Sequence, residues 1–239
     1  MLTEEELEIE KRAIIYAKKH RTKICRKLTN KEVYVPEENP VSVFMSGSPG
    51  AGKTEFSVGL IKQLEEKGTK ILRLDPDDLR NEFEEYQGGN SYLFQRAVSL
   101  FIERSLDFIY KNKQSFLLDG TFASYNVADK NIQRSLDKNR HVLVFFVYQH
   151  PKLAWKFVQA REKVEGRKIN PDSFLSQFFG SQQVIQDLKN KFGKKIRVDV
   201  ILKDNDGKTK DCHTDVDSLV PYLKPLFAED EIKKIVGLR

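Results

Sequence analysis

Cysteine and histidine are scarce in this sequence of 239 residues, which contains two cysteines and four histidines. Cys25 and Cys212 form no C-x-x-C pair, so they offer neither a disulfide framework nor a paired thiolate metal site. The histidines are scattered, without the spacing of metal ligands. The sequence therefore indicates a reducing compartment and excludes the small, disulfide-stabilised class of secreted proteins.

Long apolar segments are missing too. The longest apolar run, Val142 to Tyr148, is far shorter than the ~20 residues that a membrane-spanning helix needs. The first residues are charged and contain no apolar core of a secretory signal. We therefore expect a cytoplasmic protein without a membrane partner.

The composition is instead that of a folded, soluble domain. Hydrophobic residues make up 39% and charged residues 32% of the sequence, with 16 phenylalanines. A chain of this length is expected to form one large domain, or one domain with a small appendage, and to bury roughly 70–75% of its unfolded surface. The net charge of +6 is spread along the sequence. Such a mild excess suits phosphate-bearing ligands and is too diffuse to indicate a nucleic acid partner by itself.

Short apolar segments alternate with amphipathic ones along the chain. Predicted strands occupy residues 41–46, 70–75, 115–119, 141–149 and 195–203. Predicted helices occupy residues 3–28, 53–67, 77–85, 91–111, 124–139, 151–166 and 171–192, and the segment from residue 215 onward is expected to be mostly helical. This alternation implies parallel strands joined by right-handed crossovers. The predicted fold is a three-layer α/β/α domain with a mainly parallel sheet of about five strands.

The first predicted helix stands outside this alternation. We predict an N-terminal helical extension and linker over residues 1–40, followed by the α/β domain over residues 41–239. Thr3 followed by Glu6 predicts a capping box at the start of the extension.

An eight-residue stretch after the first predicted strand matches the pattern G-x-x-x-x-G-K-[ST] in full. It consists of Gly47, Ser48, Pro49, Gly50, Ala51, Gly52, Lys53 and Thr54. Glycines allow backbone N–H groups to turn inward around phosphates, and the helix that follows directs its positive end at the same anion. In such a loop the lysine reaches the β and γ phosphates, and the threonine hydroxyl binds Mg²⁺. A dinucleotide-binding loop would need G-x-G-x-x-G, so the stretch predicts a site for a nucleoside triphosphate.

Two further predicted strands end in acidic residues. Asp75, Asp77 and Asp78 follow the second strand, and Asp119 ends the third. In a parallel sheet these ends lie beside the phosphate loop. Phosphoryl transfer to a hydroxyl needs a carboxylate that accepts the proton and a metal held by oxygen ligands. We predict Asp77 as the base and Asp119 as a Mg²⁺ ligand of the Walker B type, and we interpret Asp78 as a first-turn or capping acid.

Several positions remain open between two interpretations. Asp75 is a candidate metal-site residue, and Thr121 either binds the substrate or caps a turn. Arg161 and Arg167 follow the fourth strand, where an arginine can stabilise the charge of the transferred phosphoryl group. The alternative for both arginines is a solvated, charged helix.

Four segments together resemble the zeta-toxin family of P-loop kinases. They are residues 44–54, 74–80, 119–122 and 161–167. The resemblance implies a kinase domain that transfers the γ-phosphoryl group of ATP, with Mg²⁺, to a hydroxyl of a small molecule. For the best-known members this acceptor is the nucleotide sugar UDP-N-acetylglucosamine. It also implies an antitoxin as a protein partner.

The resemblance assigns roles residue by residue. Asp77 matches the catalytic base of the family, and Lys53 matches its phosphate-loop lysine. Thr121 matches a substrate-side threonine, and Asp119 stands where the family usually has glutamate. Arg161 and Arg167 match the two arginines that contact the γ-phosphate, although they lie closer together here than in the best-known toxins. The sequence has no nucleotide-sugar signature, so the resemblance describes the phosphoryl donor better than the acceptor.

Other functions remain as alternatives. In the first alternative, the acceptor of the same reaction is a nucleic acid 5′ end or another nucleotide, although no stripe of basic and aromatic residues supports this. A nucleotide-dependent switch or binding module is a second alternative, but the Asn-Lys-x-Asp guanine motif is absent. A catalytically inactive scaffold is a third. Residues 1–35 either brace the domain or inhibit it in cis.

Overall fold

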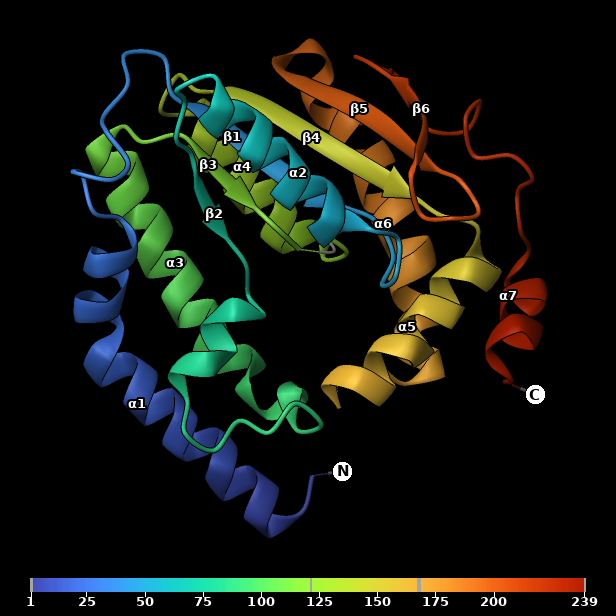
Figure 1. The fold of residues 1–239 in the computed structure, drawn as a ribbon, viewed down its shortest axis with the longest axis horizontal. Helices are drawn as coiled ribbons and strands as arrows, with labels where there is room; N and C mark the ends of the chain where they lie inside the picture. The colour runs from blue at the N-terminus through green and yellow to red at the C-terminus, as the bar shows by residue number, and fades with distance from the viewer. Residues whose placement is uncertain (1, 121, 167–168, 239) are drawn as a thin grey trace.

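The computed structural model describes residues 2–120, 122–166 and 169–238, which contain a six-stranded sheet flanked by helices (Figure 1). The strand order is β2-β3-β1-β4-β5-β6. The strands are β1 (Val41–Ser46), β2 (Leu72–Leu74), β3 (Phe116–Leu118), β4 (His141–Tyr148), β5 (Ile196–Lys203) and β6 (Thr209–His213). The first five pair in parallel, so their carboxyl ends lie along one edge of the sheet.

Helices cover both faces of this sheet, as the sequence predicts. Side chains alternate between the faces along a strand, so Val43 and Met45 of β1 point to one face and Phe44 to the other. The first face is covered by α2 (Lys53–Glu66), and the second by α3 (Gln95–Asn112), α4 (Tyr125–Leu136) and α6 (Pro171–Phe192) (Figure 1). The three-layer α/β/α architecture is thereby confirmed.

Two further helices, both shorter than α6, lie in the carboxyl-terminal half of the chain. Helix α5 (Pro151–Glu165) begins at a proline, as its sequence predicts, and packs with α6 and with α7 (Glu229–Val236) around Phe174. No helix among the described residues is both long and apolar enough to cross a bilayer.

The structure differs from the predicted elements in three places. The sequence predicts no strand at β6, because its residues are mostly exposed and polar and it pairs only with β5 at the edge of the sheet. The segment from residue 215 onward is mostly irregular before α7, since Pro221 and Pro225 interrupt it. The helix expected at 77–85 is the short 3₁₀ turn η1 (Asp78–Glu82), and a second 3₁₀ turn, η2 (Ser91–Phe94), precedes α3.

The N-terminal helix α1 (Glu4–Leu28) is packed on the domain. Thr3 and Glu6 form the predicted capping box at its start. Ala13, Ala17 and Cys25 are buried in a hydrophobic cluster with α3, η1 and η2, and Figure 1 shows α1 running along the outside of α3. Beyond the helix, the side chain of Gln114 donates to the main-chain oxygens of residues 29 and 34. These contacts favour the bracing interpretation of residues 1–35.

Deletion of residues 1–35 is therefore expected to destabilise the protein. The deletion exposes Phe94 and Phe101 in the cluster under α1 and leaves the buried Gln114 amide without its two carbonyl acceptors. We expect the unfolding temperature to fall by at least about 10 °C. Thermal unfolding and turnover of the truncated chain test this expectation. A soluble truncation with raised turnover would instead support inhibition in cis.

Candidate functional site

The predicted phosphate loop connects β1 to α2. Gly52 adopts a left-handed conformation, with a φ of 86°, and stands directly before the first residue of α2. The ammonium group of Lys53 donates to the main-chain oxygen of Gly47 at 2.9 Å and to that of Ser48 at 2.8 Å. The loop is therefore curved around its own lysine, at the N-terminus of a helix, the end that attracts anions.

Two glycines of this loop are required by the space around them. A β-carbon on Gly47 would lie 2.2 Å from the main-chain oxygen of Val147, in β4. A β-carbon on Gly50 would lie 2.1 Å from the main-chain oxygen of Ala154, in α5. Both glycines also have φ values, 137° and 71°, that other residues rarely adopt. The loop is thus pressed against β4 and α5, which set its position in the fold.

A cavity of about 710 Å³ opens beside the loop. Its walls come from the loop, the ends of β2 and β3, the start of α3, and α5 with α6. Of the predicted catalytic, metal and substrate residues, those that line it are Lys53, Thr54, Asp75, Asp77, Asp119 and Arg161. Thr121 and Arg167 lie outside the described residues. The strand order explains the convergence, because β2, β3 and β1 are neighbours whose ends face the same cavity.

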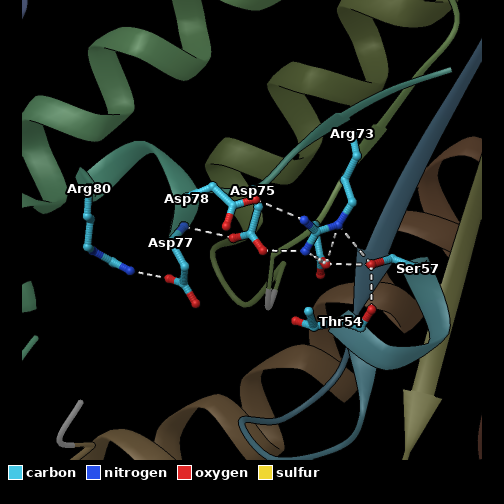
Figure 2. Close-up of polar contacts among 8 residues, drawn as sticks. Thr54, Ser57, Arg73, Asp75, Asp77, Asp78 and Arg80 are labelled. Carbon is cyan, nitrogen blue, oxygen red and sulfur yellow. Dashed lines mark hydrogen bonds and ion pairs between the residues drawn. The ribbon is translucent and has the colours of Figure 1, made fainter. Parts of the chain in front are cut away.

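Arg73, from β2, links the acidic residues of the site (Figure 2). Its guanidinium forms an ion pair with Asp75, a second with Asp119 at 2.7 Å and a third with Asp78 at 3.0 Å. The hydroxyl of Ser57, in α2, also donates to Asp119 at 2.6 Å. Asp119 is thereby held from both sides, by the strand beside it and by the helix after the phosphate loop.

Asp75 is almost fully buried in this network. Burial and the neighbouring charge of Asp119 raise the pKa of Asp75 to about 6, and the Arg73 guanidinium opposes this rise. The other Asp75 oxygen accepts a hydrogen bond from the main-chain N–H of Asp77 at 2.7 Å. Asp75 therefore connects the charge of Arg73 to the backbone of the predicted base.

Asp77 lines the cavity. Its carboxylate pairs with Arg80 (Figure 2). Arg80 is buried, and its guanidinium also donates to the side chain of Gln95, in α3, at 3.3 Å. Asp77 precedes η1 but makes no side-chain capping bond there. Asp78 lies in the first turn of η1, as predicted, with a side chain that is 70% exposed. The two adjacent acids thus have different surroundings, and only Asp77 lines the cavity.

The oxygen donors beside the loop suit a magnesium ion. Thr54 offers a hydroxyl and Asp119 a carboxylate, and Mg²⁺ takes hard oxygen ligands together with water and phosphate oxygens. Among the described residues, the side-chain contacts of Asp119 all go to Oδ2. Its Oδ1 is therefore the oxygen that would bind the metal. The predicted Mg²⁺ ligands therefore fit this ion by their chemistry.

Sequence reasoning missed three residues of this site: Ser57, Arg73 and Arg80. Arg73 gave one local signal, since it is a charged residue inside an apolar strand. Ser57 and Arg80 gave none, because each acts on a residue brought close only by folding or by the turn of η1.

Comparison with protein families gives a match over most of the chain. A model of the Zeta toxin family matches residues 25–217 of the chain. A search among curated proteins finds no match.

Solved structures with low sequence identity share the fold. A structure from the PezAT chromosomal toxin-antitoxin system of Streptococcus pneumoniae is 16% identical, with a TM-score of 0.64 over 99% of this chain and 94% of that chain. A native structure of the AvrRxo1-ORF1:-ORF2 complex is 14% identical, with a TM-score of 0.62 over 80% of this chain and 65% of that one. A structure of AvrRxo1-ORF1:-ORF2 with ATP is 13% identical, with a TM-score of 0.57 over 87% and 65%.

Proposed function

Because this chain belongs to the zeta toxin family, we propose that it is a kinase that transfers the γ-phosphoryl group of ATP to a hydroxyl group of a small molecule. One observation carries the proposal, namely that four residues line one cavity. They are Lys53 and Thr54 of the phosphate loop, the acid Asp77, and Arg161 of helix α5. These are the parts that phosphoryl transfer to a hydroxyl needs.

Each part has a separate task in the proposed reaction. The loop backbone and Lys53 hold the β and γ phosphates of ATP, and Arg161 stabilises charge on the transferred group. Asp77 accepts the proton of the attacking hydroxyl while Arg80 keeps its carboxylate turned to the cavity. Thr54 and Asp119 would hold Mg²⁺, and Asp75 shares the Arg73 guanidinium with Asp119. When bound, this ion neutralises negative charge on the phosphate oxygens.

The acceptor in this proposal is a nucleotide sugar such as UDP-N-acetylglucosamine. Besides the phosphate loop and Asp77, the cavity is lined by residues at η2, at the start of α3 and in and just before helix α6. These residues carry hydroxyl and amide side chains, which suit the hydroxyl groups of a sugar: Ser91, Gln95, Asn170, Ser173 and Gln177. The support is the chemistry of this wall together with the family.

An antitoxin partner is a further part of the proposal. Its support is the family and the likeness to a structure described as part of a toxin-antitoxin system. Copurification of the chain with the product of a neighbouring reading frame tests this part separately from the enzymatic one.

Phosphoryl transfer from γ-labelled ATP in the presence of Mg²⁺ tests the enzymatic part. The acceptor panel contains nucleotide sugars, nucleosides, dinucleotides and oligonucleotides with a 5′-OH end. We expect label on a nucleotide sugar. Label on an oligonucleotide would replace this acceptor but retain the kinase. Binding of ATP without transfer to any member of the panel would favour a switch or a scaffold.

Lys53→Ala is the matching loss-of-function variant. Removal of a group that stabilises developing charge is expected to lower the rate of transfer by roughly 10²–10³-fold. Lys62→Ala is the control, since Lys62 lies on the same helix α2 with its side chain exposed. Equal rates in the two variants would contradict the role of Lys53.

A further inference from the structure

A buried cation lies between two acidic residues of the site. The side chain of Arg73 is 17% exposed, while those of Asp75 and Asp119 are 7% and 3% exposed. One atom of the guanidinium, Nη2, contacts a carboxylate oxygen of both acids. The same guanidinium reaches Asp78 through Nη1. Three carboxylates thus share one positive charge.

Two buried carboxylates cannot both stay ionised side by side without a positive charge between them. Asp75 and Asp119 end the neighbouring strands β2 and β3, and the Asp119 N–H continues the sheet by donating to the Leu74 carbonyl at 2.8 Å. This hydrogen bond fixes the main chains of the two strand ends. The two carboxylates therefore cannot relieve their mutual repulsion by a movement of the main chain. In a metal site a divalent cation would supply the missing charge. In this fold Arg73 supplies it from within the chain.

Arg73 also orients the groups around the nucleotide site. Its planar, charged fork fixes the direction of each hydrogen bond, so Oδ2 of Asp119 is held toward β2. Asp75, held by the same guanidinium, accepts the N–H of Asp77 at 2.7 Å. One side chain therefore positions a proposed Mg²⁺ ligand directly and the proposed base through Asp75.

We propose that Arg73 is a positioning residue that takes the place of a divalent cation between Asp75 and Asp119, so that Mg²⁺ enters the site together with the nucleotide. The inference rests on the proposed kinase function and adds the order in which cation and nucleotide bind. Without Arg73, the two carboxylates would hold a divalent cation by themselves, before any nucleotide is bound.

Binding of Mn²⁺ to the nucleotide-free, full-length chain tests this inference. Mn²⁺ takes the same oxygen ligands as Mg²⁺, and the unbound ion is counted directly by electron paramagnetic resonance. We expect Arg73→Met to bind Mn²⁺ at least about tenfold more tightly than the unmodified chain, because a unit positive charge is removed from beside both carboxylates. Equal binding by the two proteins would overturn the proposal.

Two further variants separate charge from packing. Arg140 is a matched control, since it is also buried but lies at the opposite end of the sheet, where it donates to Ser42 at 2.7 Å. We expect Arg140→Met to leave Mn²⁺ binding unchanged. Arg73→Lys keeps a positive charge and is expected to bind Mn²⁺ no more tightly than the unmodified chain. Tight binding by Arg73→Lys or Arg140→Met would show that lost packing, not lost charge, is the cause.

A folding defect in Arg73→Met leaves the inference testable. If the variant is unfolded without metal, we expect Mn²⁺ to restore its folding transition, and a failure of Mn²⁺ to do so would contradict the proposal. Neither measurement contains ATP or an acceptor. Failure of this inference is therefore distinguishable from failure of the proposed function, which the transfer assay with Lys53→Ala tests.

Discussion

Replacement of Asp77 by asparagine is expected to lower the turnover of phosphoryl transfer by roughly 10²–10⁴-fold, the usual contribution of a general base. Asparagine keeps the size of the side chain and its contact with Arg80 but cannot accept the proton of the attacking hydroxyl. Binding of ATP is expected to stay unchanged, because the phosphates are held by the loop and Lys53. Turnover measured at saturating ATP, with ATP affinity measured separately by calorimetry, checks both expectations.

Asp78→Asn is the control for this prediction. The two acids are adjacent, but Asp78 is 70% exposed and does not line the cavity. The Asp78 carboxylate meets Arg73 from the solvent side, so we expect its loss to change turnover by less than about fivefold. If Asp78→Asn lost activity and Asp77→Asn kept it, the wrong acid would have been chosen as the base. Thermal unfolding of both variants shows whether a loss of turnover reflects a loss of fold.

Gly47→Ala is expected to lower the free energy of unfolding by more than about 3 kcal/mol, because the new methyl group meets main-chain atoms and the backbone conformation is strained for alanine. The methyl group would lie 2.2 Å from the Val147 carbonyl oxygen, in a strand that cannot retreat because it pairs with β1 and β5. The Gly47 carbonyl also accepts a hydrogen bond from the Lys53 ammonium. Displacement of the loop would therefore move Lys53 as well and is expected to abolish ATP binding. Chemical denaturation and calorimetry with ATP measure the two effects.

Gly59→Ala is the matched control for that substitution. Gly59 lies within α2, and a β-carbon there would meet no atom within 4 Å. Alanine favours a helix over glycine, so we expect this variant to gain about 0.5–1 kcal/mol of stability and to bind ATP normally. Destabilisation of both variants to the same degree would show that the steric argument at Gly47 is wrong.

The architecture was predicted well wherever the signal is local. Strand β1 and helix α6 have the predicted limits, because an apolar run followed by a glycine-rich turn, and a proline-led amphipathic segment, each carry their own boundaries. Strand β6 was missed because an exposed edge strand has no apolar pattern. The segment after residue 215 was predicted as helix from its composition, but Val216 and Leu219 pack there on the sheet without forming helical turns.

The candidate site divides in the same way. The sequence alone determined the phosphate loop, because the spacing of its glycines, Lys53 and Thr54 is local chemistry, and it placed the acids at strand ends. Only the tertiary structure decided which acids share a cation. The strand order β2-β3-β1 brings Asp75 beside Asp119. It also lets Arg73, from β2, and Ser57, from α2, both contact Asp119. No periodicity along the chain encodes that order, because it depends on how separate helices and strands bury their apolar faces against one another.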